Sequence, residues 1–371
     1  MRNQINIILI LVITSIALIL GCAKEKEIKI GVITPLTGEG ATYGEDTKRG
    51  VDLAVEEINK KGGIDGKMIT VIYEDDQIDP ETGTKAIQKL ISINKVPVII
   101  GAFGSSVSLA IAPIAEKNRV VLFSASSTAD ALKDAGDYFF RNVPPNSAQG
   151  KSAAEFAIDK LKVKTAAILY MNNDYGVSLT KAFENFFLQR GGTIVITENY
   201  NPGDRDFRTQ LSKIKDKQPD IVFYPGHYQE SGIILKQARE LGIKSVFIGG
   251  DGSYSPELIK IAGGAAEGSY YTLMAMGYGI ADEEIKRFTN SFNTKYSLEP
   301  DVYSAYAYDA LKIIAEAIQR GGYSSEGIKN ALYQIKDFIG VTGITSFDTF
   351  GEVNKPFYIY EVKNGNFELY K

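Results

Sequence analysis

The chain has 371 residues, of which 44% are hydrophobic and 23% are charged, which is typical of a folded protein rather than of a disordered or collagen-like chain. Its 41 basic and 45 acidic residues give a net charge of −4, which argues against nucleic acid as a partner because no basic excess is available to release counterions. A single histidine and a single cysteine leave little material for a nitrogen–sulfur metal site or for histidine-based catalysis, so no metal is expected and most hydrolase chemistries are disfavoured.

The first 27 residues predict export and a lipid anchor. After Arg2, residues 7–20 are uncharged and mostly apolar, which suits the core of an export signal but is shorter than the about 20 apolar residues of a membrane span. The run ends in Ile19-Leu20-Gly21-Cys22, which resembles the lipobox of bacterial lipoproteins. We therefore expect a lipoprotein signal peptide over 1–21 and a lipid-anchored linker over 22–27, with Cys22 carrying the lipid. An uncleaved anchor helix is the alternative, and either one tethers the chain outside the cytoplasm.

From residue 28 onward, β-rich runs alternate with helical periods. Val51, Ala54, Val55 and Ile58 have helical spacing, and further helical segments are 153–161, 179–188 and 233–241. The β-rich runs are 28–34, 68–73, 96–100, 120–123, 166–170, 193–197, 221–224 and 246–248. Such alternation predicts right-handed crossovers and parallel sheets with helices on both faces. We expect an α/β protein of about two domains.

Two features interrupt or end this series. Val143-Pro144-Pro145 predicts a crossover between domains over 142–146, because consecutive prolines suit neither a helix interior nor a central strand. Helices are predicted to dominate residues 282–335. At the end of the chain, 357–362 and 367–370 flank Asn364-Gly365, which is a strong hairpin signal.

Two clusters resemble known binding loops but do not have the residue spacing of those loops. Gly38, Gly40 and Gly44 follow the first predicted strand as in a dinucleotide-binding loop. The acidic residues at the end of the second predicted strand, Glu74 and Asp75, lie about 30 residues past Gly44 instead of about 20. We interpret the glycines as a backbone turn that lets a ligand or the opposite domain approach. The acidic cluster of Glu74, Asp75, Asp76 and Asp79 lacks a calcium-loop spacing and is interpreted as a solvated strand end with a helix cap.

Hydroxyl groups gather at two predicted strand-to-helix junctions. Gly101–Ser106 follows the predicted strand 96–100 and precedes a helix expected from about Val107, and Ser124–Thr128 follows the next strand. Free backbone NH groups and hydroxyls at two helix starts would suit a small anion such as a carboxylate. Plain N-capping is the alternative, although it needs only one hydroxyl per helix. His227 has no second histidine or cysteine with which to bind a metal, and is either a pocket-lining or a surface residue.

The chain resembles the branched-chain amino-acid receptor family of periplasmic binding proteins over nearly all of the predicted mature sequence. The residues that carry the resemblance are Ile30-Gly31-Val32, Pro35-Leu36-Thr37-Gly38, Tyr43-Gly44, Ala54 to Asn59, Gly62-Gly63-Ile64, Asp75-Asp76, Asp79-Pro80, Gly101 to Ser106, Asp174-Tyr175-Gly176, Gln237-Ala238-Arg239, Phe347-Asp348 and Gly351. The resemblance implies a type I flytrap fold in which two lobes, joined by three crossings, close on a ligand. The crossings are expected near 142–146, 274–279 and 343–347, with lobe 1 formed by 28–143 and 276–345 and lobe 2 by 144–275 and 346–371.

The resemblance also implies a ligand site, residue by residue. Ser105 and Thr128 are expected to hold the ligand α-carboxylate, with Ser126 and Ser127 at the backbone positions beside it. Asp251 matches the acidic residue that meets the α-ammonium, and Tyr175 matches a tyrosine of the closing lobe.

The ligand side chain is expected to lie between Tyr43 and Phe103, and here the sequence departs from the family. His227 stands where receptors for aliphatic amino acids have a tyrosine, and Asp251 is shorter than the usual glutamate. Ile78 and Gly104 occupy positions that form a disulfide in some relatives. These departures leave open a larger or more polar side chain.

The resemblance therefore implies an extracytoplasmic, lipid-anchored receptor for an amino acid, branched-chain or otherwise aliphatic, that serves an ABC importer through its permease subunits. A binding protein of this kind is expected to need no cofactor and to have no enzymatic activity. A receptor of the same fold for an amide, urea or aromatic acid is one alternative. A secreted hydrolase that uses His227 as its base is another.

Overall fold

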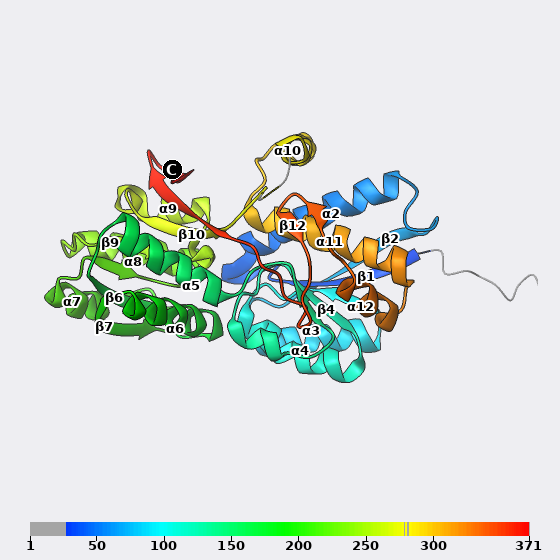
Figure 1. The fold of residues 1–371 in the computed structure, drawn as a ribbon, viewed down its shortest axis with the longest axis horizontal. Helices are drawn as coiled ribbons and strands as arrows, with labels where there is room; N and C mark the ends of the chain where they lie inside the picture. The colour runs from blue at the N-terminus through cyan, green and yellow to red at the C-terminus, as the bar shows by residue number, and fades with distance from the viewer. Residues whose placement is uncertain (1–26, 278, 280–281, 371) are drawn as a thin grey trace, which may run out of the picture.

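The structure, a computed structural model, describes residues 27–277, 279 and 282–370. The predicted signal peptide, Cys22 and most of the predicted linker lie outside these residues. Two α/β lobes lie side by side along the longest axis (Figure 1). Within the described ranges, none of the helices combines the length and hydropathy that a membrane span requires.

The first lobe is built on a five-stranded sheet of order β2-β1-β3-β4-β5, in which every pairing is parallel. Its strands are β1 (Glu27–Thr34), β2 (Met68–Asp75), β3 (Val98–Ile100), β4 (Val121–Ser124) and β5 (Phe139–Arg141). Its helices are α2 (Ala41–Lys60), α3 (Pro80–Ser92), α4 (Ser105–Asn118), α10 (Asp282–Tyr296), α11 (Val302–Gly321) and α12 (Ser325–Tyr333).

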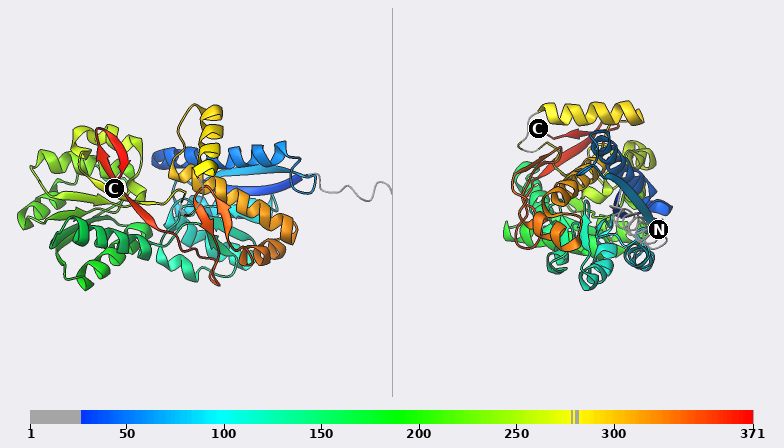
Figure 2. Two further views of the ribbon diagram at one scale, coloured as in Figure 1. Left: turned by 45° about the horizontal axis from the view of Figure 1, so that its top comes forward. Right: turned by 90° about the vertical axis from the view of Figure 1, so that its right-hand side faces the viewer.

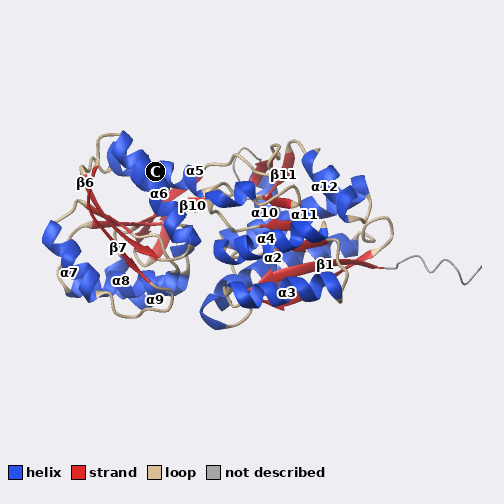
Figure 3. Ribbon diagram, turned by 90° about the horizontal axis from the view of Figure 1, so that it is seen from below, coloured by secondary structure: helices blue, strands red, loops and turns tan. Residues whose placement is uncertain are grey.

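Helices cover both faces of this sheet (Figure 3). Alternate β1 residues, Ile30 among them, pack with α2 and α11, whereas Ile33 packs with α3 and α4 on the other face. α10 lies at the edge of the lobe, where the Lys295 ammonium pairs with Glu56 of α2 (Figure 2). Burial on both faces explains why the strands read as continuous apolar runs.

The second lobe contains a seven-stranded sheet of order β14-β13-β10-β9-β8-β6-β7. Its strands are β6 (Thr165–Met171), β7 (Thr193–Tyr200), β8 (Ile221–Phe223), β9 (Val246–Gly249), β10 (Tyr270–Met274), β13 (Phe357–Lys363) and β14 (Asn366–Leu369). Its helices are α5 (Asn146–Glu155), α6 (Asp174–Gln189), α7 (Arg208–Lys217), α8 (Tyr228–Glu240) and α9 (Pro256–Ala262). The pairings are parallel except for β10–β13 and the β13–β14 hairpin. Both the α/β fold class and the terminal hairpin are confirmed.

Several element boundaries differ from the sequence prediction. The helix expected over 153–161 begins at Asn146, directly after the prolines, and continues as a π-helical turn over Phe156–Lys160. Strands β5 and β10, with the small hairpin β11 (Phe338–Gly340) and β12 (Gly343–Thr345), were not predicted. Three of these strands have three residues and one has five, which is too short for a clear alternation of apolar and polar positions. The segment 124–128 does not start an α-helix, since only the short 3₁₀ turn η2 (Asp130–Asp134) follows it.

The expected third crossing and the lobe boundary at residue 346 need correction. The Phe347 ring packs edge-on against Phe123 and Phe140 of the first lobe, with ring centroids 5.8 and 5.6 Å away. Farther along, the Lys355 ammonium donates to Thr342 Oγ1 at 2.9 Å. Residues 347–355 therefore stay with the first lobe, and the chain enters the second lobe only just before β13 (Figure 1). The expected crossing at 274–279 includes residue 278, which lies outside the described residues.

Candidate functional site

The carboxyl ends of β3 and β4 bring two hydroxyl-bearing segments together in the first lobe. Ser105 is the first residue of α4, and its Oγ accepts a hydrogen bond from the Ala129 backbone NH at 3.2 Å. The Ser126 hydroxyl donates to the Phe103 carbonyl at 3.1 Å, so the loop after β4 is fastened to the segment after β3. Adjacent parallel strands end at one edge of a sheet, where ligands of such folds commonly bind.

The remaining hydroxyls of this loop have different environments. The Ser127 backbone NH donates to Ser124 Oγ at 2.9 Å, and its hydroxyl bonds to the Ala102 and Phe103 carbonyls. The backbone NH groups and hydroxyls of both Ser126 and Ser127 are therefore engaged within these two segments, and their expected place beside the ligand carboxylate stays a prediction. The Thr128 hydroxyl is buried and makes no hydrogen bond within the described part of the chain. A buried hydroxyl without a partner is costly unless a ligand or water completes it.

Arg141, at the end of β5, supports the same loop from behind. Its side chain is fully buried, and its Nη1 donates to the carbonyls of Ser127 at 3.2 Å and Ala129 at 3.0 Å. Its Nε donates to Glu352 at 2.6 Å. Burial lowers the pKa of Arg141 and raises that of Glu352, whereas each partner's charge opposes the shift of the other. This ion pair ties the loop to residues 347–355.

In the second lobe, a buried carboxylate faces the hydroxyl-bearing loop. Asp251 opens the short 3₁₀ turn η4 (Asp251–Ser253) after β9 and is 3% exposed. Its Oδ1 accepts from Tyr175 Oη and from Gln149 Nε2, each at 2.8 Å. Desolvation raises the pKa of Asp251, and these two hydrogen bonds oppose the rise. Since both side-chain donors reach Oδ1, Oδ2 is left without one among the described residues.

Aromatic rings form the wall between the two polar ends. Tyr43 stacks on Phe103 with centroids 4.3 Å apart, and Tyr303, the second residue of α11, meets both rings edge-on at 5.3 and 5.1 Å. The His227 ring lies 5.9 Å from Tyr43 and 6.2 Å from Tyr175. Burial lowers the pKa of His227, so this ring is neutral at neutral pH. Such a wall suits an apolar group.

These groups surround a small cavity of about 20 Å³ between the lobes. It is lined by Phe103, Gly104, Ser105, Ser126, Tyr175, His227, Asp251, Gly252 and Tyr303. A larger cleft of about 470 Å³ shares Gly104, Ser105, Tyr175 and His227 with it and leads outward between the lobes. His227 is therefore a pocket-lining residue, whereas Tyr43 lies behind Phe103 and Thr128 lies in the loop beyond Ser126.

Sequence reasoning missed Gln149 and Tyr303. Gln149 lies just beyond the crossover predicted over 142–146, in the first turn of α5, which was not predicted. Tyr303 follows Asp301, whose carboxylate forms a capping box with Ser304. An acidic cap followed by an aromatic residue signals a helix start, but nothing local indicates that this helix start faces the cleft.

The acidic cluster after β2 is structural. Asp79 caps α3 by accepting from the Thr82 backbone NH at 2.8 Å, and Asp75 accepts from the Leu36 backbone NH at 2.8 Å. Asp76 is completely buried, which raises its pKa to about 7, so the prediction of a solvated strand end is wrong for this residue. No group of metal-binding side chains occurs within the part of the chain that the structure describes.

Hydroxyl groups of the first lobe contact the backbone of the second lobe at the cavity. Tyr43 Oη donates to the Gly252 carbonyl and accepts from the Tyr228 backbone NH at 3.1 Å. Tyr303 Oη donates to the Asp251 carbonyl at 2.6 Å. The described structure is therefore a closed form, in which the segment that carries Asp251 is held against the first lobe.

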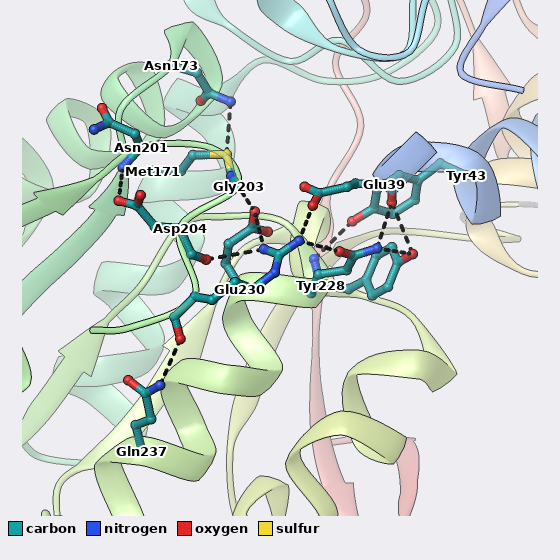
Figure 4. Close-up of polar contacts among 12 residues, drawn as sticks. Glu39, Tyr43, Met171, Asn173, Asn201, Gly203, Asp204, Tyr228, Glu230 and Gln237 are labelled. Carbon is teal, nitrogen blue, oxygen red and sulfur yellow. Dashed lines mark hydrogen bonds and ion pairs between the residues drawn. The ribbon is translucent and has the colours of Figure 1, made fainter. Parts of the chain in front are cut away.

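A polar cluster at the mouth of the cleft adds to this closure (Figure 4). The Arg205 guanidinium pairs with Glu39 across the cleft and donates to Gln229 Oε1 at 3.1 Å. The Glu39 carbonyl accepts from Gln229 Nε2 and Tyr228 Oη, both at 3.1 Å. Glu39 lies in the turn η1 (Gly38–Gly40), so the glycine-rich segment lets the opposite lobe approach. The sequence predicted the approach of either a ligand or the opposite domain at this turn.

We expect Arg205→Met to weaken ligand binding about twofold to fivefold, because Arg205 contacts the first lobe only in the closed form and its pairing is partly exposed to solvent. Arg208→Met is the matched control, since Arg208 pairs with Asp206 and Glu240 inside its own lobe. Calorimetric titration of both variants makes the comparison. Equal affinities of the two variants would exclude a role for Arg205 in closure.

Comparison with known proteins agrees with this geometry. The family described as "Periplasmic binding protein" matches residues 27–366. The chain is 31% identical over 351 residues to the Leu/Ile/Val-binding protein homolog 2 of Brucella abortus, covering 93% of both chains. It is 35% identical, with a TM-score of 0.87, to the branched-chain amino acid transporter substrate binding protein LivJ of Streptococcus pneumoniae in complex with isoleucine, covering 92% of this chain and 98% of that one. It is 32% identical, with a TM-score of 0.88, to the leucine binding protein LivK of Thermotoga maritima, covering 93% and 98%. Together with the two-lobe fold, these matches show that the chain belongs to the periplasmic binding protein family.

Proposed function

We propose that this protein is an extracytoplasmic receptor for an amino acid, branched-chain or otherwise aliphatic, that delivers its ligand to the permease subunits of an ABC importer. The observation that carries the proposal is one cavity with an uncharged, hydroxyl-rich end, a carboxylate at the other end and aromatic rings between them. A zwitterion with an apolar side chain matches all three parts. The same ligand class is supported by one relative named as a Leu/Ile/Val-binding protein homolog and by another whose structure contains isoleucine.

One end of the cavity has a hydroxyl donor without an acceptor, and the other has a carboxylate oxygen without a side-chain donor. The Thr128 hydroxyl is buried without a partner near Ser105, and a ligand carboxylate would accept from such a donor. Asp251 keeps one carboxylate oxygen free of side-chain donors, and a ligand ammonium would supply them. We assign Ser105 and Thr128 to the carboxylate, with Ser126 and Ser127 beside it. Asp251 and Tyr175 are assigned to the ammonium, and Tyr43, Phe103 and His227 to the side-chain surroundings.

The test is calorimetric titration of the refolded, ligand-free receptor with L-leucine, L-isoleucine, L-valine, benzoate, urea and acetamide. We expect saturable binding of at least one of the amino acids and none of the compounds that lack an amine, because burying Asp251 without a cation leaves an unpaired charge. Binding of benzoate, urea or acetamide alone would replace the proposal by the alternative receptor for an amide, urea or aromatic acid. The hydrolase alternative has no support, since the His227 ring makes no hydrogen bond to a nucleophile among the described residues.

Affinity for an amino acid should fall on acidification. Desolvation raises the pKa of Asp251 in the unliganded receptor, and only the ionised carboxylate pairs with an ammonium, so binding releases a proton where Asp251 is protonated. Below that raised pKa, affinity should drop up to about tenfold per pH unit, because at most one proton is exchanged at this group. Titrations from pH 4 to 8 measure the slope. An equally steep profile in Asp251→Asn would assign the dependence to another group.

We also propose that Cys22 carries a lipid that tethers the receptor to the membrane after cleavage behind Gly21. The support is the sequence Ile19-Leu20-Gly21-Cys22 after an apolar run of export-signal length. Mass spectrometry of the amino-terminal peptide from a membrane fraction tests this. A mature chain that begins at another residue, or an unmodified Cys22, would contradict it.

A further inference from the structure

Gln149 is a fully buried side chain whose amide connects the carboxylate of the cavity to the sheet of the second lobe. It lies in the first turn of α5, and its Nε2 donates to Asp251 Oδ1 at 2.8 Å. The same nitrogen lies 3.0 Å from the carbonyl oxygen and 2.9 Å from the hydroxyl of Thr272 in β10. The amide therefore links α5, η4 and β10 at a single point.

The orientation of this amide is set by its neighbours. The Asp251 carboxylate and the Thr272 carbonyl are acceptors, so the NH₂ group must face them and Oε1 must face away. Gln149 Oε1 is buried and has no hydrogen-bond partner within the described residues. An unsatisfied buried oxygen lowers stability, and local costs of this kind are typical of functional sites.

The two oxygens of the Asp251 carboxylate therefore have different hydrogen-bond partners. Gln149 and Tyr175 both donate to Oδ1, and the Tyr175 hydroxyl is fixed in turn because it accepts from the Gly252 backbone NH at 3.0 Å. The backbone NH groups of Asp251 and Gly252 also favour the ionised carboxylate. With Oδ1 held by two side chains, rotation of the carboxylate is restricted, and Oδ2, which accepts from no side chain among the described residues, remains for the cavity that Asp251 lines.

We propose that Gln149 is a positioning residue that fixes the Asp251 carboxylate through Oδ1 and so reserves Oδ2 for the cationic group of the ligand. The proposal deepens the proposed function and rests on it, since it assigns the cation to Asp251. Gln149 itself does not line the cavity, so it acts only through Asp251.

The first test measures binding of L-leucine and L-isoleucine by Gln149→Met, a variant of similar size without the amide. At neutral pH we expect about tenfold weaker binding, and we expect the pH at which affinity falls to move upward by about one unit, because a donor that favours the ionised carboxylate is lost. Asn59→Leu is the control, since it removes a partly buried amide that bonds only to the Ile69 backbone in the first lobe. An unchanged pH profile in Gln149→Met would overturn the proposal.

The second test needs no ligand. The folded pKa of Asp251 lies above its unfolded value, so its ionisation lowers stability as pH rises, and this loss should be larger without the Gln149 donor. We therefore expect urea unfolding to show that Gln149→Met destabilises the protein more at pH 7.5 than at pH 4.5. The excess should disappear in an Asp251→Asn background. A loss that is equal at both pH values and in both backgrounds would reduce Gln149 to a packing role.

The comparison of the two backgrounds distinguishes the titration of Asp251 from that of the other titratable groups around it. Tyr43, Tyr175 and Tyr303 face it from the surrounding elements, and burial raises the pKa of each well above 10, so they remain neutral in this range. His227 lines the same cavity, and its pKa is lowered, so it affects stability only at acid pH. Because His227 is present in both backgrounds, its effect cancels when they are compared. If wild-type protein binds no amino acid, the proposed function fails, whereas the ligand-free comparison still decides the role of Gln149.

Discussion

Replacing Asp251 by Asn should weaken amino-acid binding by about 1.5–3 kcal/mol, which is roughly tenfold to 150-fold in Kd. Asn keeps the size of the side chain but removes the charge that pairs with an ammonium in a site that is 3% exposed. The same change should leave stability at neutral pH unchanged or slightly higher, because desolvation makes the ionised carboxylate unfavourable in the unliganded protein. Calorimetric titration and urea unfolding of one preparation measure both quantities.

The matched control for this prediction is Asp220→Asn. Asp220 lies in the same lobe, and its carboxylate accepts from the backbone NH groups of Lys164 and Thr165 at 2.9 and 2.8 Å, away from the cavity. Its replacement should leave affinity unchanged. If Asp251→Asn binds the amino acid as tightly as this control does, Asp251 does not contact the ammonium.

Replacing Arg141 by Met should lower the free energy of unfolding by about 3–5 kcal/mol. The guanidinium is fully buried, and its removal leaves the Glu352 carboxylate and the Ser127 and Ala129 carbonyls without their donor. Because these carbonyls belong to the loop that carries Thr128, affinity for the amino acid should also decrease. Urea unfolding followed by circular dichroism gives the stability, and titration under native conditions gives the affinity.

Two variants test the mechanism of that loss. Arg190→Met removes a guanidinium that is 39% exposed and pairs with Asp159, and it should cost no more than about 1 kcal/mol. The double replacement Arg141→Met with Glu352→Leu should recover part of the stability, since it removes the unpaired carboxylate as well. A loss for Arg141→Met no larger than that for Arg190→Met would show that the buried pair is not a main support of the loop.

The positions of the hydroxyl-bearing junctions along the chain could be predicted because they depend on local signals, whereas Asp251 and Tyr175 were expected only from the family resemblance. An apolar run that leads into glycines and serines predicts a strand end and a polar junction, and parallel strands bring such junctions to one edge of a sheet. Ser105 and Ser126 were expected at such an edge for this reason, and both line the cavity. The second junction was nevertheless misjudged as a helix start, since a serine-rich loop and an N-cap have the same composition and differ only in the conformation of the next residues.

The amino-acid sequence alone was sufficient to identify the α/β alternation, the terminal hairpin and the chemistry of the polar junctions, because each depends on neighbours within a few residues. Only the tertiary structure placed Gln149 behind Asp251, brought Tyr303 to the cavity and kept residues 347–355 on the first lobe. Several of these contacts join residues far apart in the chain, such as Tyr303 with Asp251, which are 52 positions apart, and Arg141 with Glu352, which are 211 positions apart. Such pairings depend on how the two lobes close and on which buried charges find partners, and no local pattern of residues encodes either.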